Sequence, residues 1–202
     1  KSIHFEQKIL NEAVGSQDQI AATYGGLNKI TFQKDGKFKV NPIMIKKETM
    51  TKLNNNLILV YTGQKRNAQD IAKGYIHKLT TNKKRQIMQI SDYAFEGEKA
   101  LRNGNLNDFG KLLHETWLQK KSLNSNVTNS RIDSIYSTAI KHGALGGKLL
   151  GAGGGGFLLF YSPQRYKKNI IKNLNKLLTI PFQFSSEGST IMFKKLDTNQ
   201  GK

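Results

Sequence analysis

Gly143-Ala144-Leu145-Gly146-Gly147-Lys148-Leu149-Leu150-Gly151-Ala152-Gly153-Gly154-Gly155-Gly156-Phe157 is the stretch that most constrains the fold. It holds eight of the 19 glycines. Because glycine costs about 1 kcal/mol relative to alanine in regular structure, such a cluster indicates positive φ angles or close approach of another group. One interpretation is a loop whose N–H groups bind phosphate, with Lys148 adding a charge. The alternative is tight packing between a helix end and a strand.

The segments beside the glycines predict helix and strand in turn. Apolar residues recur at i, i+3, i+4, i+7 and i+8 over residues 132–140, which predicts a helix that ends at Gly143. The continuous apolar run 157–161 predicts a buried strand. Ser162-Pro163 then predicts the N-cap and first turn of a further helix, whose apolar positions reach Leu178.

The first third of the chain predicts a hairpin and a second buried strand. Two β-rich runs, 28–33 and 37–45, flank an Asp35-Gly36 pair of the kind found in hairpin turns. The run 57–61 is continuously apolar, as expected for a strand covered on both faces.

The remaining segments complete a mixed architecture. Residues 66–121 read as mostly helical, and 181–185 and 190–194 as two short strands. The order of strands and helices predicts an α+β fold, with a sheet backed by helices on one face.

The charge of the chain favours anionic partners. Lys and Arg number 32 against 14 Asp and Glu, a net charge of +18 over 202 residues. Only five of the bases are arginine, and no aromatic–basic stripe accompanies them, so specific nucleic-acid recognition ranks behind a solvated lysine surface. A nucleic-acid binder would show a steep salt dependence. Anionic small molecules fit the charge equally well.

The composition also bounds the location of the chain. There is no cysteine, which excludes disulfides and thiolate metal sites and favours a reducing compartment. No apolar run reaches the roughly 18 to 20 residues that a membrane span needs. We therefore expect a cytoplasmic location without membrane association.

Four blocks of the sequence resemble a known family. The glycine-rich segment resembles the third, C-terminal motif of the GHMP kinases, the galactokinase, homoserine kinase, mevalonate kinase and phosphomevalonate kinase family. The other blocks are similar to its heptose 7-phosphate kinase branch of bacterial sugar kinases, in order from about residue 3 to about residue 195. They are Gly15-Ser16-Gln17-Asp18-Gln19-Ile20-Ala21-Ala22-Thr23-Tyr24-Gly25-Gly26-Leu27-Asn28, Tyr61-Thr62-Gly63 with Arg66, and Leu112-Leu113-His114-Glu115-Thr116-Trp117 with Lys120.

The resemblance implies a two-domain kinase fold. Residues 1–52 would be the remainder of an N-terminal domain of the ribosomal-protein-S5 type, and residues 53–202 a ferredoxin-like C-terminal domain. ATP with Mg²⁺ and a sugar or sugar phosphate would bind in the cleft between them. The implied reaction is phosphoryl transfer from ATP to a sugar hydroxyl, most closely the anomeric hydroxyl of a heptose 7-phosphate.

The resemblance also implies roles for individual residues. Asp18 matches the position of the catalytic carboxylate, which accepts or aligns the proton of the attacking hydroxyl. Taken alone, an Asp at this place would more often cap a helix. Implied substrate-binding residues are Gln17, Tyr24, Gly25, Thr62, Arg66, Gly151, Gly153 and Gly154; implied ATP-binding residues are Lys148, Gly153, Gly154 and Gly155; no metal ligand is assigned.

Two members of the matching blocks have simpler explanations. Arg66 is suited to clamping a substrate phosphate, but it heads a polar helix and is equally explained as a solvated charge. His114 precedes Trp117 by one turn, and a lone histidine of this kind is more often a hydrogen-bonded core residue than a ligand.

One family element has no match in this sequence. GHMP kinases carry, upstream of the aspartate block, a Pro-x-x-Gly-Leu-Gly-Ser-Ser loop that wraps the ATP phosphates and offers a serine to magnesium. The three prolines, Pro42, Pro163 and Pro181, begin no such loop. We therefore expect about a third of a full kinase to lie outside this sequence, and the chain alone to be inactive.

The missing loop leaves two further possibilities open. The chain can be a non-catalytic module that binds a sugar phosphate or a partner subunit. An apolar face left exposed would associate with a missing N-terminal segment or a second copy of the chain.

Overall fold

A four-stranded antiparallel sheet is the centre of the computed structural model, which describes residues 2–11, 15–64, 83–123, 125–151, 153–190 and 192. Its strand order is β4-β5-β3-β6. The bounds are Leu57–Tyr61 for β3, Gly146–Leu149 for β4, Phe157–Tyr161 for β5 and Thr179–Ile180 for β6. Residues far apart in sequence pair here, for example Ile58 with Phe160.

Both faces of this sheet carry apolar cores. Alternate side chains of a strand point to opposite faces. Ile58 and Phe160 belong to a cluster with α7 and α8, whereas Leu57 and Tyr161 pack with residues of α3, α5 and α6. The expectation that helices back only one face is therefore wrong, and the continuous apolar runs of β3 and β5 follow from this double coverage.

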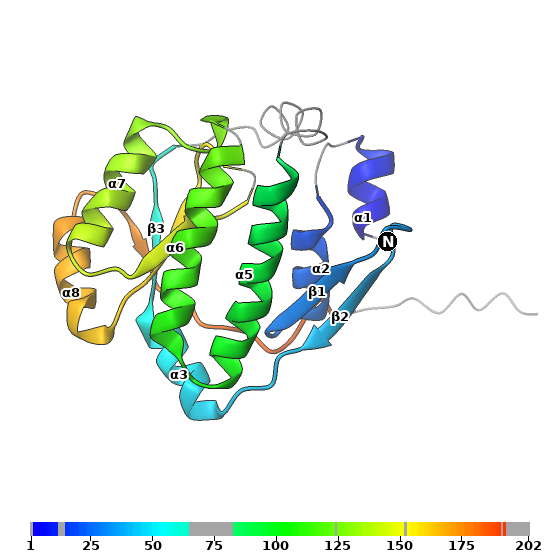
Figure 1. Ribbon diagram of the computed structural model, residues 1–202, viewed down its shortest axis with the longest axis horizontal. Helices are drawn as coiled ribbons and strands as arrows, with labels where there is room; N and C mark the ends of the chain where they lie inside the picture. Colours follow the sequence, from blue (N-terminus) through cyan, green and yellow to red (C-terminus); the bar gives the residue numbers. More distant parts are fainter. Residues whose placement is uncertain are drawn as a thin grey trace, which may run out of the picture.

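Helices α5 (Lys84–Arg102) and α6 (Leu106–Leu123) form an antiparallel pair that packs along β4 (Figure 1). Gly104, with φ 73°, makes the turn between them. Helix α7 (Ser130–Lys141) begins at Asn129, whose side chain accepts a hydrogen bond from the Ile132 N–H at 3.1 Å. This cap satisfies one of the free N–H groups at the helix start.

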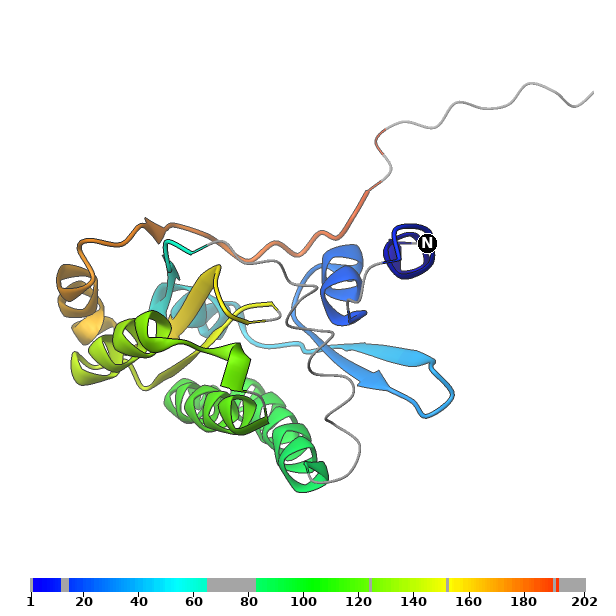
Figure 2. The same ribbon diagram turned by 90° about the horizontal axis from the view of Figure 1, so that it is seen from above.

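The N-terminal part lies on the side of the sheet away from α7 and α8 (Figure 2). It comprises α1 (Ser2–His4), the π-helical turn η1 (Phe5–Ile9), helix α2 (Gln17–Tyr24) and a hairpin of β1 (Asn28–Phe32) and β2 (Phe38–Pro42). Helix α3 (Lys47–Asn56) follows and packs against the sheet and α8. The hairpin meets α5 through Lys29, whose ammonium lies 2.8 Å from a Glu98 carboxylate oxygen.

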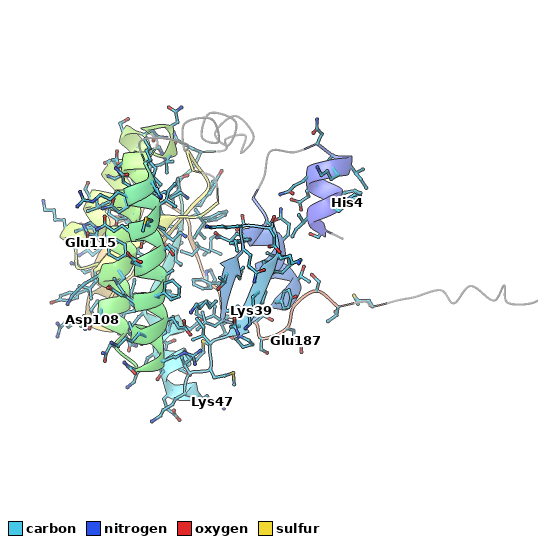
Figure 3. All side chains as sticks on the ribbon, turned by 45° about the vertical axis from the view of Figure 1, so that its right-hand side comes forward. His4, Lys39, Lys47, Asp108, Glu115 and Glu187 are labelled. Carbon is cyan, nitrogen blue, oxygen red and sulfur yellow. The ribbon has the colours of Figure 1, made fainter. Side chains whose placement is uncertain are left out.

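A segment that we call the strap, residues 181–189, runs from β6 back to α2 (orange in Figure 2). Figure 3 labels Glu187 where the strap passes the N-terminal part. The Gly26 N–H donates to Ser185 O at 2.9 Å, and the Ser189 N–H donates to Ala22 O at 3.1 Å. At Gly188 the backbones approach so closely that a Cβ would lie 2.0 Å from Thr23 O. The strap therefore fixes the C-terminal end of α2.

Most elements flanking the glycines match their predictions. The hairpin, β3 and β5 are confirmed, as is the helix before Gly143. The later helix, α8 (Gln164–Asn173), begins after Pro163 rather than Ser162 as N-cap, and it ends well before Leu178.

One predicted strand is wrong, one is untested, and one strand was not predicted. Residues 181–185 are not a strand, because they leave the sheet as the strap. The predicted strand 190–194 lies mostly outside the described residues. Conversely, β4 occupies glycine-rich sequence for which no strand was predicted. The fold is α+β, as predicted, and none of the described helices is long and apolar enough to cross a membrane.

Candidate active site

The first half of the glycine-rich segment is packed. Gly146 and Gly147 lie in β4 between α6 and β5. A Cβ on Gly146 would lie 2.1 Å from Gly110 O, and one on Gly147 would lie 2.5 Å from Leu159 O. Side chains at these positions would force the backbones apart, so the close-packing interpretation applies to this half.

The second half is a loop, residues 150–156, that we call the glycine loop. Gly151 has φ 70° and no atom within 4 Å of its Cβ position. Gly153 has φ 112° and lies against Val127, whose carbonyl accepts the Gly154 N–H at 2.8 Å. The Gly154 N–H is therefore engaged within the protein, and Gly154 offers clearance rather than a donor. Gly155 is partly buried in the same turn.

Thr62 anchors this loop to the end of β3. Its side chain is 0% exposed, and both its N–H and its hydroxyl donate to Gly156 O at 2.9 Å. The Arg131 Nε donates to Thr62 O at 2.8 Å from α7. Thr62 therefore supports the loop from beneath instead of facing an open site.

Two lysines flank the start of the glycine loop. Lys148 lies in β4, and Lys120 reaches across from α6 to donate to Gly151 O at 2.9 Å. Both side chains are partly buried. Burial and the neighbouring charge of Lys148 lower the pKa of Lys120 to about 8, and burial lowers the pKa of Lys148.

Asp18 faces this lysine pair from the first turn of α2. Its negative charge acts on both ammonium groups and opposes the lowering of the pKa of Lys120 and Lys148. The N-cap of α2 is Ser16, so Asp18 is not the cap residue. Its side chain is exposed, and the strap holds the other end of its helix. A carboxylate, two cations and the glycine loop thus converge from three elements distant in sequence.

The other predicted site residues divide into three cases. Gln17 and Tyr24 are exposed, at the start and end of α2. Gly25 packs on the strap, where a Cβ would lie 2.3 Å from the Glu187 carbonyl carbon. Arg66 lies outside the described residues.

His114 has a structural role. Its Nδ1 lies 2.9 Å from the Tyr136 hydroxyl, which donates to Gly147 O at 3.3 Å. Burial raises the pKa of Tyr136, so the hydroxyl keeps its proton. This chain of hydrogen bonds ties α6 and α7 to β4, in agreement with the core interpretation of the histidine.

Lys120 is the residue that sequence reasoning left without a role. The sequence signal was its place in the block around His114 and Trp117, three residues after the tryptophan. A residue three positions after Trp117 lies on the same face of α6, and Trp117 is fully buried.

The site offers groups that can bind phosphate, but the described residues form no cluster of metal ligands. Gly151 is open, and the two lysines supply charge beside it. Among the described residues, no three His, Cys, Asp or Glu side chains gather to hold a metal ion. These residues therefore fit the phosphates of a nucleotide or a sugar.

Comparison with known proteins identifies one domain of the chain. Residues 98–179, from the end of α5 to the start of β6, match the family model described as GHMP kinases C terminal. This region is therefore a GHMP kinase C-terminal domain.

Individual relatives extend the similarity to the N-terminal part. The chain is 34% identical over 91% of its length to a D-glycero-alpha-D-manno-heptose 7-phosphate kinase of Campylobacter jejuni, of which it covers 55%. The crystal structure of a sugar kinase from the same species has a TM-score of 0.69 at 31% identity, over 91% of this chain and 52% of that one.

A second solved structure gives the same result. A D-glycero-D-manno-heptose 1-phosphate kinase from Bacteroides thetaiotaomicron has a TM-score of 0.65 at 26% identity, over 92% of this chain and 51% of that one. The chain thus spans about half the length of these relatives.

Proposed function

We propose that the protein is a GHMP-type sugar kinase that transfers the γ-phosphoryl group of ATP to a hydroxyl of a sugar phosphate. The acceptor is the anomeric hydroxyl of a heptose 7-phosphate. The observation that carries this proposal is that the charge of Asp18 acts on Lys120 and Lys148 beside the glycine loop. The 34% identity to a heptose 7-phosphate kinase supports the choice of sugar.

Asp18 is the catalytic carboxylate in this proposal. Its exposed side chain is free to accept or align the proton of the acceptor hydroxyl while the phosphoryl group transfers. The cations of Lys148 and Lys120 stabilise negative charge on the phosphoryl oxygens. Gly151 leaves room for those oxygens, and Gly25 and Thr62 keep α2 and the loop in place.

ATP supplies the transferable phosphoryl group when it is bound. Lys148, Gly153, Gly154 and Gly155 would lie along its phosphates. Gln17, Tyr24 and Arg66 complete the proposed sugar side. No magnesium ligand is assigned in this proposal.

The two proposed domains meet within helix α3 (Lys47–Asn56). Residues 1–52, with α2 and the hairpin, form the catalytic-domain part, and residues 53–202 form the ferredoxin-like part around the four-stranded sheet. The proposed catalytic carboxylate then lies on the first part and the glycine loop on the second. The strap crosses between them and supports this arrangement.

The 202-residue sequence contains no Gly-Leu-Gly-Ser-Ser loop. We infer that this stretch by itself does not transfer phosphate, because positioning and electrostatics supply nearly all catalysis in phosphoryl transfer. Sequencing the reading frame upstream of the Lys1 codon tests this inference. We expect an in-frame Gly-Leu-Gly-Ser-Ser there.

The activity itself is tested on the protein that includes such a loop. Phosphorus NMR follows ATP and heptose 7-phosphate during turnover. We expect Asp18→Asn to lower kcat by roughly 10² to 10⁴-fold while the KM for ATP changes little. Asp35→Asn, in the exposed hairpin turn, is the matched control. Full activity of Asp18→Asn would exclude the proposed role.

The second candidate function is a non-catalytic module that binds a sugar phosphate or a partner subunit. Lys120 and Lys148 beside the open Gly151 would serve such a module equally well. Calorimetry separates the two, since a module binds heptose 7-phosphate without responding to ATP. A start codon at residue 1 would also favour the module.

A further inference from the structure

A groove of about 440 Å³ lies between α7 and the turn that follows α8. The two helices cover the face of the sheet opposite the N-terminal part (Figure 2). The residues that line the groove are therefore distinct from the proposed site residues, and the phosphoryl-transfer reaction gives them no role. A volume of this size is typical of sites for small molecules.

The floor of the groove is apolar. Ile135 of α7 and Leu174 after α8 line it, and both are buried members of the core on this face of the sheet. Leu177 lines it as well and packs against the same cluster. Apolar surface at the base of a groove favours a ligand with an apolar part, because binding removes that surface from water.

The charge around this floor is only positive. Arg131 in the first turn of α7 and Lys176 in the turn after α8 line the groove, and none of the described lining residues is acidic. In the part of the chain that the structure describes, neither cation forms an ion pair, and the nearby Asp133 pairs with Lys121. The other lining residues are neutral and polar, namely Ser134, Thr138, Asn173 and Asn175.

We propose that this groove binds a small organic anion. The charged group lies at Arg131 and Lys176, and the apolar body covers Ile135 and Leu174. The guanidinium of an arginine presents its donors in a planar fork that suits a carboxylate, sulfonate or phosphate group. A ligand that carries both an anionic group and an apolar body uses both halves of the groove, whereas a bare anion or a neutral hydrocarbon uses one.

Both walls of the groove are held in place by contacts within the protein. The Arg131 Nε donates to Thr62 O at 2.8 Å, and the guanidinium lies so near Gly63 that a Cβ there would be 2.9 Å from Arg131 Nη2. On the opposite wall the Leu177 N–H donates to Leu174 O at 2.9 Å and closes the turn. A ligand therefore meets a largely ordered site, which lowers the entropic cost of binding.

The first experiment uses naphthalene-2-sulfonate as the probe. NMR follows the isoleucine and leucine methyl groups of the protein, and we expect the largest shifts at Ile135, Leu174 and Leu177. The exposed Ile9 and Leu10 of the N-terminal part report non-specific adsorption to apolar surface. Largest shifts at Ile9 and Leu10 would overturn the proposal.

Two matched probes test the two halves of the ligand. Neutral 2-naphthol lacks the charge, and sulfate lacks the apolar body. Each should bind at least about tenfold more weakly than naphthalene-2-sulfonate at neutral pH. Equal affinity of 2-naphthol and the sulfonate would exclude a role for the cations.

Charge removal tests the position of the anionic group. Lys176→Met should weaken binding of naphthalene-2-sulfonate by about tenfold. Lys172→Met removes the same charge from an exposed position of α8 outside the lining, so it should bind like the wild type. Equal affinity of the two variants would contradict the proposal. Arg131 stays unchanged here because it holds Thr62 O.

Filling the groove gives a test that leaves every charge in place. Ser134→Phe puts a large side chain into the lining, and it should abolish the methyl shifts at Ile135 and Leu174. Ser137→Phe, on the exposed side of the same helix, is the matched control and should bind normally. Unchanged binding by Ser134→Phe would place the ligand elsewhere.

These outcomes do not depend on the kinase activity. Binding in the groove by a protein that transfers no phosphoryl group would leave this proposal standing and remove the proposed function. Phosphoryl transfer by a protein whose groove binds no probe would do the reverse.

Discussion

At Gly146 an added methyl group would lie 2.1 Å from a carbonyl oxygen of α6, whereas at Gly151, five residues later, no atom lies within 4 Å. The first glycine allows a helix to pack on a strand. The second takes a positive φ angle in an open loop beside two lysines. Two glycines of one motif therefore occur for different physical reasons. A single explanation for all the glycines of the motif would be wrong for half of them.

The largest expected effect is the loss of stability when a glycine in the packed half of the glycine-rich segment is substituted. Gly146→Ala should lower the free energy of unfolding by about 3 kcal/mol, because backbone rather than a flexible side chain must move. Chemical denaturation measures this value. A loss below about 1 kcal/mol would show that α6 and β4 separate easily. Gly15→Ala, with no atom within 4 Å, is the control and should be nearly neutral.

The strap provides the next test. Gly188→Ala would place a Cβ 2.0 Å from Thr23 O and should shift α2 away from the lysines. Since the charge of Asp18 raises the pKa of Lys120, we expect that pKa to fall below about 8. NMR of ¹³C-methylated lysines measures it. An unchanged pKa would mean that the strap does not position Asp18.

A smaller loss of stability is expected when Gly151, in the open half of the glycine-rich segment, is substituted. Gly151→Ala should cost only about 1 kcal/mol of stability, from the left-handed backbone alone. The measurement is again denaturation, run beside Gly146→Ala. If the two variants lost equal stability, the distinction between packed and open glycines would fail.

The last expected effect is on the pH dependence of stability. The folded state lowers the pKa of Lys120 to about 8, below the value of about 10.4 for an unfolded chain. Between these values the unfolded state binds more protons, so the free energy of unfolding should rise with pH relative to Lys120→Met. Denaturant titrations at several pH values test this, and a fall over the same range would contradict the burial of the ammonium.

The local elements could be predicted from the sequence where one physical signal dominated. The apolar runs of β3 and β5 indicate burial on both faces, and the Asp35-Gly36 turn sets the hairpin. β4 escaped prediction because glycine has low strand propensity, and only the approach of α6 explains its presence there. The strap was predicted as a strand for a related reason. The apolar residues at 181–185 fit a strand, and their spacing does not show that the chain leaves the sheet.

The candidate site was predicted in its parts and not in its geometry. Asp18, Lys148 and the glycine loop follow from the family resemblance. That Thr62 is buried under the loop, and that Lys120 reaches Gly151 O from α6, depends on contacts between elements remote in sequence. Such contacts leave no periodic signal in the chain.

The bond between Ser189 and Ala22 joins residues 167 positions apart. Ribosomes release a chain from its N-terminus, so α2 emerges long before the segment that holds it. During synthesis the helix that bears Asp18 lacks this support until residues 185–189 have been made, and only then is the proposed catalytic geometry complete. A growing chain can thus fold its sheet while the carboxylate is still unplaced.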